Sequence, residues 1–144
     1  MKILLDTSVL VAALVSAHPE HTRALPWLQR IAAGNEAGVA AAHTLAELYA
    51  ILTTLPVQPR ISPKAAAELI KRNVIDTCEV VSLSPEGYGA LVEHLSGIGI
   101  VGGATYDAII PRVAEEQQVD QVVTFNVKDF RRVNPGMADR IVAP

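Results

Sequence analysis

The first apolar run of the chain, residues 3–5, is short and is followed at once by a polar triplet. Asp6, Thr7 and Ser8 separate it from a second apolar stretch over residues 9–14. This order is typical of a central parallel strand that leads into a helix: the strand is apolar on both faces, a cap residue follows it, and a helix-like stretch comes next. The pattern therefore predicts that Asp6 lies at the carboxyl end of a buried strand, where open α/β sheets bind ligands.

Strand-like and helix-like stretches alternate along the rest of the chain. Further strands are predicted at residues 37–42, 80–83, 121–124 and, as a short edge strand, 141–142. Apolar positions at helical spacing predict helices at residues 20–33, 44–55, 63–74, from 85 and from 105. This alternation indicates an α/β fold, a three-layer α/β/α domain with a mainly parallel central sheet of four to five strands. Right-handed crossovers would place all strand exits on one rim.

Local signals set several helix boundaries. Glu47 follows Thr44 by three residues, which is capping-box spacing and predicts that Thr44 caps its helix. Ser62 and Ser84, each followed by proline, predict two further helix starts. Pro111 should kink its helix or remove a hydrogen bond. Residues 97–103 hold four glycines but lack the lysine and hydroxyl of a phosphate loop, so we expect a flexible approach to the next helix.

Composition narrows the class of protein. The chain of 144 residues suits a single domain over residues 1–144, and its 50% hydrophobic but only 4% aromatic content suits a core of aliphatic side chains. No apolar stretch reaches the roughly 20 residues of a membrane span. No signal peptide is visible, and the single cysteine excludes an internal disulfide, so we expect a cytoplasmic protein without membrane contact. A net charge of −3 argues against coating nucleic acid through a large basic surface, but not against a small groove.

Acidic residues recur at the predicted strand exits and helix starts. They are Asp6, Glu47, Asp107 and Asp129, the last beside Thr124 and Asn126. Each alone could be a helix cap or a solvated charge. Together on one rim they would repel one another unless a cation neutralised them, and Mg²⁺ prefers such oxygen ligands. Because a carboxylate-bound cation can activate water and stabilise a phosphoryl transition state, we infer hydrolysis of a phosphodiester.

The ordered motifs resemble the PIN-domain ribonucleases, and most closely the VapC toxins of toxin–antitoxin pairs. The similarity rests on Leu4-Leu5-Asp6-Thr7-Ser8, Glu47, Tyr106-Asp107-Ala108-Ile109-Ile110 and Val123-Thr124-Phe125-Asn126-Val127-Lys128-Asp129-Phe130, and it covers essentially the whole chain. The resemblance implies a parallel sheet with helices on both faces. It also implies Mg²⁺- or Mn²⁺-dependent endonucleolytic cleavage of RNA, a cognate antitoxin that silences the enzyme, and a homodimer.

The resemblance also assigns roles to individual residues. Asp6 and Asp107 would be direct metal ligands, and Glu47 would help to bind metal or to activate water. Hydroxyl groups would hold the acids or the water, with Thr124 and either Thr7 or Ser8 supplying them. The fourth acidic position of the family falls on Asn126, which brings an oxygen without a charge. This departure puts a tightly held second metal in doubt, and Asp129 is a candidate to compensate.

Other readings of the sequence stay open. The absent fourth acid leaves room for a catalytically impaired PIN-like module that binds RNA or protein. A receiver-like or phosphatase-like domain that uses Asp6 as phosphoryl acceptor is disfavoured, because the second acids of those families are missing.

Two candidate binding surfaces each have a functional and a purely structural interpretation. One is a group of basic residues that could bind phosphates or could be a solvent-exposed run of charges, namely Lys128, Arg131 and Arg132. The helices around residues 56–59, with Leu25, Trp27 and Leu28, could form an antitoxin groove or could be core.

Overall fold

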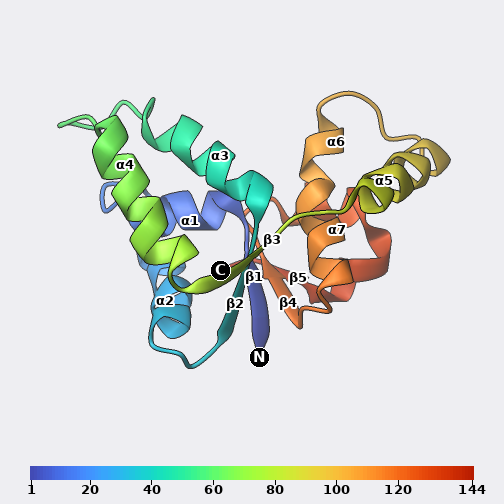
Figure 1. Ribbon diagram of the computed structural model, residues 1–144, viewed down its shortest axis with the longest axis horizontal. Helices are drawn as coiled ribbons and strands as arrows, with labels where there is room; N and C mark the ends of the chain where they lie inside the picture. Colours follow the sequence, from blue (N-terminus) through green and yellow to red (C-terminus); the bar gives the residue numbers. More distant parts are fainter.

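The computed structural model describes residues 1–144 and contains one five-stranded sheet in the order β3-β2-β1-β4-β5 (Figure 1). The strands are β1 (Lys2–Leu5), β2 (Ala37–Ala41), β3 (Cys78–Val81), β4 (Gln121–Val123) and β5 (Ile141–Val142). All four neighbouring pairs are parallel. The predicted α/β class is confirmed, and the five strands lie within the predicted range of four to five.

Helices cover both faces of the sheet, as the three-layer prediction requires (Figure 1). One face carries α1 (Thr7–Leu14), α2 (His21–Ala32), α3 (Ala42–Leu52) and α4 (Pro63–Ile70), which runs on into a π-helical turn at Lys71–Ile75. The other carries α5 (Pro85–Gly97), α6 (Ala104–Asp107), α7 (Ile109–Glu116) and α8 (Val127–Val133), followed by a 3₁₀ turn at Pro135–Arg140. None of these helices has the length and hydrophobicity that crossing a bilayer demands.

The central strand β1 explains why the first apolar run is unbroken. It pairs with β2 along one edge and with β4 along the other, and helices pack on both of its faces. Ile3 and Leu5 pack into the core beneath α1–α4, whereas Leu4 packs into the core beneath α5–α8. Each of the three is at most 1% exposed, so a polar residue at any of these positions would be buried without a partner.

The predicted capping box at Thr44 is wrong. Helix α3 begins at Ala42, and its N-cap residue Ala41 provides no side-chain hydrogen bond. Strand β2 runs directly into this helix without a loop, so Thr44 is the third helical residue and is fully buried. Glu47 consequently lies in the second turn of α3, where its side chain is free for a task other than capping.

The other boundary signals are largely confirmed. The Ser62 hydroxyl accepts the Ala65 backbone N–H at 3.1 Å, and the Ser84 hydroxyl accepts that of Gly87 at 3.0 Å. The helix expected from residue 105 is broken at Ala108 into α6 and α7. Its proline, Pro111, is the third residue of α7, where a helix has no partner for the backbone N–H.

Candidate active site

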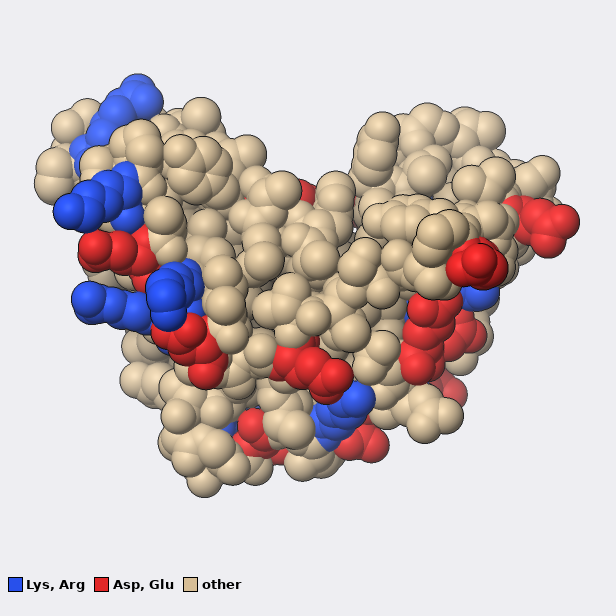
Figure 2. All heavy atoms as spheres, viewed as in Figure 1, with Lys and Arg blue, Asp and Glu red and all other residues tan.

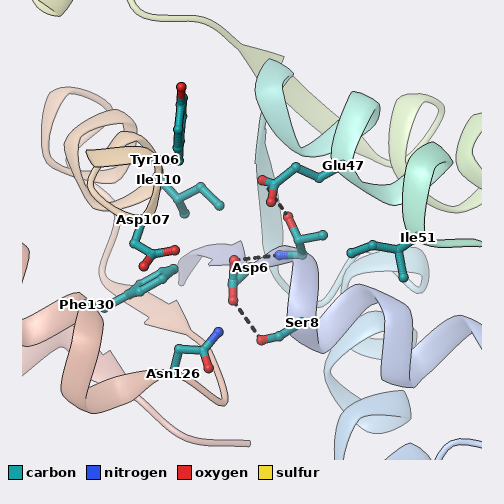
Figure 3. A pocket seen from close by; sticks show the side chains of 10 residues that line it. Asp6, Ser8, Glu47, Ile51, Tyr106, Asp107, Ile110, Asn126 and Phe130 are labelled. Atoms are coloured by element: carbon teal, nitrogen blue, oxygen red, sulfur yellow. Dashed lines mark hydrogen bonds between the residues drawn. The ribbon is translucent and has the colours of Figure 1, made fainter. Parts of the chain in front are cut away.

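Four of the predicted site residues converge on one pocket of about 150 Å³ (Figure 3). Asp6 follows β1, Glu47 lies on α3, Asp107 ends α6, and Asn126 follows β4. The pocket opens between the α3 side and the α6 side of the molecule, where Figure 2 shows a notch with mostly uncharged walls. Side chains that are distant along the chain therefore share one rim, as right-handed crossovers in a parallel sheet lead one to expect.

The carboxylate of Asp6 is held rigidly at the floor of this pocket. It is only 4% exposed. Its Oδ1 accepts the Thr7 backbone N–H at 2.7 Å, and its Oδ2 accepts the hydroxyls of Ser8 at 2.7 Å and Thr124 at 2.8 Å. Burial raises the pKa of Asp6, and these hydrogen bonds partly offset that rise. Asp6 is thus both the N-cap of α1 and a carboxylate of fixed orientation.

The hydroxyl groups around Asp6 connect two strand exits. Thr124 is fully buried and does not line the pocket, and its oxygen also accepts the Asn126 backbone N–H at 2.9 Å. The Ser8 oxygen accepts the Phe125 backbone N–H at 3.2 Å. The turn after β4 is thereby tied to the turn after β1. Thr124 and Ser8 act through Asp6 and are positioning residues.

Glu47 faces Asp6 from the opposite wall. Its Oε1 accepts the Thr7 hydroxyl at 3.2 Å and lies 3.3 Å from Nε2 of His43. Partial burial raises the pKa of Glu47, His43 and the Thr7 hydrogen bond lower it, and the charges of Asp6 and Asp107 raise it further. His43 was not among the predicted site residues, although it precedes Glu47 by four residues, which places the two side chains on one face of the helix.

Asp107 is the least restrained of the three acids. It is exposed, and its carboxylate forms no hydrogen bond to another residue. Partial burial raises its pKa, and the charges of Asp129 and Asp6 raise it further, while Arg132 opposes the rise. Asp6, Glu47 and Asp107 therefore interact electrostatically, and their mutual repulsion destabilises the folded state in the absence of a cation.

The structure separates the flanking charges of α8. Asp129 lies outside the pocket but close enough to act on Asp107. Arg131 is exposed, as expected for a solvated charge, and its guanidinium also donates to the backbone carbonyls of Ala138 at 3.0 Å and Ile141 at 2.8 Å. Lys128 is exposed, and Arg132 acts on Asp107.

The region proposed for an antitoxin groove is partly core and partly a surface hollow of about 270 Å³, whose lining includes Val57, Pro59 and Ile61. Leu28 is 4% exposed, and Trp27 packs against the same core with the Arg30 guanidinium 4.1 Å from its ring centroid. A different hollow of about 350 Å³ lies next to the carboxylate pocket and shares two lining residues with it. Its lining residues are Ser8, Val11, His18, Glu20, Ile51 and Phe125.

The donor set of the pocket fits a hard divalent cation. No three Asp, Glu, His or Cys side chains are close enough to enclose a metal ion by themselves. Mg²⁺ needs no such cage, because it usually takes one or two carboxylates and keeps several water molecules. The pocket offers carboxylate oxygens and the Asn126 amide, with no thiolate among its lining residues. Asp6 and Asp107 are the residues that could bind the ion directly.

Comparison with known protein families agrees with this geometry. The PIN-domain family matches residues 3–134, so the chain belongs to the PIN-domain family. Among its relatives is the ribonuclease VapC40 of Mycobacterium tuberculosis, 37% identical over 106 residues, which are 73% of this chain and 72% of that protein. Ribonuclease VapC27 of the same organism is 33% identical over 118 residues, covering 82% of this chain and 80% of that one.

A solved structure extends the similarity to the whole fold. The structure of VapBC2 from Rickettsia felis, bound to a promoter DNA fragment, superposes with a TM-score of 0.66. The alignment covers 100% of this chain and 98% of that one at 21% sequence identity. At this level of identity the match supports the fold and leaves the chemistry to the residues of the pocket.

Proposed function

We propose that this protein is a metal-dependent endoribonuclease and the toxin of a type II toxin–antitoxin pair. The observation that carries the proposal is the convergence of Asp6, Glu47 and Asp107 on one pocket at the carboxyl edge of the sheet. Relatives that share a third or more of their aligned residues with this chain are named as VapC ribonucleases. The substrate is RNA, and the bond cleaved is an internal phosphodiester.

The residues of the pocket divide the work of hydrolysis. Asp6 and Asp107 would hold Mg²⁺ or Mn²⁺, which would supply Lewis-acid chemistry for phosphodiester hydrolysis. Glu47 accepts the proton of the attacking water, a task favoured by a pKa above that of an ordinary glutamate. Thr124 and Ser8 fix the direction of the Asp6 oxygens. The Asn126 amide completes the polar lining without adding a negative charge.

The absence of a fourth acid reduces the charge available for a second metal. Because Asn126 is neutral, the pocket carries three carboxylates, and Asp129 acts only from outside it. We therefore propose that one cation is bound firmly. A module without catalysis would keep the same fold and pocket, so the decisive measurement is RNA cleavage.

The proposed partner is an antitoxin that blocks the carboxylate pocket. The hollow beside that pocket has apolar walls at Val11, Ile51 and Phe125 and shares Ser8 and Ile51 with it. A bound segment could thus occupy both hollows at once. Assembly into a homodimer is part of the same proposal.

The test uses purified protein, single-stranded RNA and added Mg²⁺ or Mn²⁺. We expect cleavage that EDTA abolishes and that the cognate antitoxin inhibits. Asp6→Asn and Asp107→Asn should each lower kcat by at least about 100-fold, because each removes a charge from the metal site. The matched control is Glu93→Gln, an exposed acid on α5 outside the pocket, which should cleave like the wild type. Equal cleavage by all four proteins, or none by the wild type, would contradict the proposal.

A further inference from the structure

Two nearly parallel aromatic rings lie beside the carboxylate pocket, that of Tyr106 in its lining and that of His43 next to Glu47. Tyr106 lies on α6 and His43 on the first turn of α3, so they come from opposite sides of the pocket. Their ring centroids are 6.5 Å apart, and their planes differ by only 6°. In Figure 3 the Tyr106 ring stands edge-on beside the pocket, so that one of its faces is turned toward α3.

The two rings are nearly parallel but are not in close contact. Their centroid distance of 6.5 Å lies near the long end of the range for aromatic pairs in proteins. Neighbouring stacked bases in nucleic acids lie about 3.4 Å apart, so a base inserted between two rings requires about 6.8 Å between their planes. Because the Tyr106 side chain is exposed, a small shift of its ring would let a flat ligand stack against both rings.

Packing within the protein does not explain the position of Tyr106. Its side chain is 64% exposed, and its hydroxyl forms no hydrogen bond to another residue. A large aromatic side chain in water at the edge of a polar pocket gains little from the core. Its π face is instead available to a ligand.

We infer that His43 and Tyr106 form a base slot that holds one nucleobase of single-stranded RNA beside the bond to be cleaved. This inference rests on the proposed ribonuclease function. Tyr106 directly precedes Asp107, and His43 lies 3.3 Å from Glu47, so the base slot adjoins two of the three acids. A base held there belongs to a nucleotide next to the phosphate at the carboxylates.

The chemistry of the base slot defines the kind of substrate. Bases in a duplex are already stacked on their neighbours, whereas unpaired bases can be turned out and stacked on Tyr or His. Stacking is tolerant of sequence because every base has a π face. The base slot therefore selects unpaired RNA and favours purines over pyrimidines through their larger stacking area.

The test compares variants that keep a ring with variants that lose it, using cleavage of a short single-stranded RNA in Mn²⁺. Tyr106→Leu should raise KM by between roughly 5-fold and 150-fold, the range of a lost base stack, while Tyr106→Phe should resemble the wild type. His43→Leu and His43→Phe form a second pair. Both alter the contact with Glu47, so only the difference in KM between them reports on the ring.

An abasic RNA supplies an independent readout. We expect one position next to the cleaved bond at which removing the base raises the wild-type KM and adds nothing further in Tyr106→Leu. Equal KM values for Tyr106→Leu and Tyr106→Phe, in a wild type that cleaves, would overturn the base slot and leave the ribonuclease function intact. A wild type that cleaves no RNA would overturn both.

Discussion

The two walls of the carboxylate pocket are built differently. Asp6 is 4% exposed, accepts three hydrogen bonds and is attached to the central strand of the sheet. Asp107 is exposed, accepts no hydrogen bond and ends the four-residue helix α6. That helix follows a connection in which Gly99 and Gly102 have φ angles of +73° and +66°, which other residues rarely adopt.

This difference assigns separate tasks to the two acids. The Asp6 wall is preorganised, so its oxygens need no rearrangement when a cation binds. The Asp107 wall lacks such restraints, and its carboxylate is free to adjust to the ion and the substrate. One acid therefore sets the geometry of the site, and the other completes it.

The largest effect is expected when the hydrogen bonds that orient Asp6 are weakened. Thr124→Val removes the buried hydroxyl that donates to Asp6 at 2.8 Å and accepts the Asn126 N–H. We expect the free energy of unfolding to fall by about 1–3 kcal/mol and kcat to fall by about 10- to 100-fold. Chemical denaturation and RNA cleavage measure the two effects. Thr54→Val, at an exposed hydroxyl outside the pocket, is the matched control; equal losses in both variants would refute the positioning role.

A smaller effect should come from binding the cation without substrate. Mn²⁺ at ten times its Kd should stabilise the folded protein by about 1.4 kcal/mol, which corresponds to a rise in Tm of about 3–6 °C. Asp6→Asn should abolish this rise, because it removes a charge from the preorganised wall. Asp129→Asn should retain it, since Asp129 lies outside the pocket. Thermal shifts with and without Mn²⁺ test this, and an unchanged shift in Asp6→Asn would contradict the ligand assignment.

The smallest expected effect concerns the dependence of stability on pH at the Asp107 wall. In the folded protein the pKa values of Asp6, Glu47 and Asp107 are raised above their ordinary values. At a pH between the ordinary and the raised values, the folded protein therefore binds more protons than the unfolded chain. The contribution of these groups to stability therefore falls as pH rises through the raised values. Asp107→Asn should raise Tm at pH 7 by at most about 2 °C, because solvent screens an exposed charge.

The same experiment contains its own control conditions. Well below pH 3.8, the ordinary value from which the pKa of Asp107 is raised, Asp107→Asn and wild type should melt at nearly the same temperature. High salt at pH 7 should also reduce the difference. A lower Tm in Asp107→Asn at pH 7 and low salt would show that repulsion does not dominate this wall.

The features that could be predicted from the sequence are those that neighbouring residues determine. The apolar run of β1, the Asp6 cap and the serine caps at Ser62 and Ser84 all depend on a few adjacent residues. Cap residues of this kind can be predicted from sequence because their hydrogen bonds form within one turn of the helix. The rim position of Asp6, Glu47 and Asp107 also followed, since it depends only on parallel strand topology.

The errors occurred where tertiary contacts override local signals. The Thr44 capping box failed because β2 passes into α3 without a loop, and Thr44 became a buried contact of Thr7. The carbonyl contacts of Arg131 were not predicted, because its partners Ala138 and Ile141 lie in the C-terminal segment that folds back on α8. The facing rings of His43 and Tyr106 belong to helices on different sides of the sheet, and no local pattern brings them together.

The bond between Thr124 and Asp6 joins residues 118 positions apart. During synthesis, β1 leaves the ribosome first and stays without one of its two neighbours until β4 has also emerged. A nascent chain that has not yet reached residue 124 lacks the hydroxyl that orients Asp6. Such a chain therefore has neither a fixed Asp6 carboxylate nor the Asn126 amide that lines the pocket.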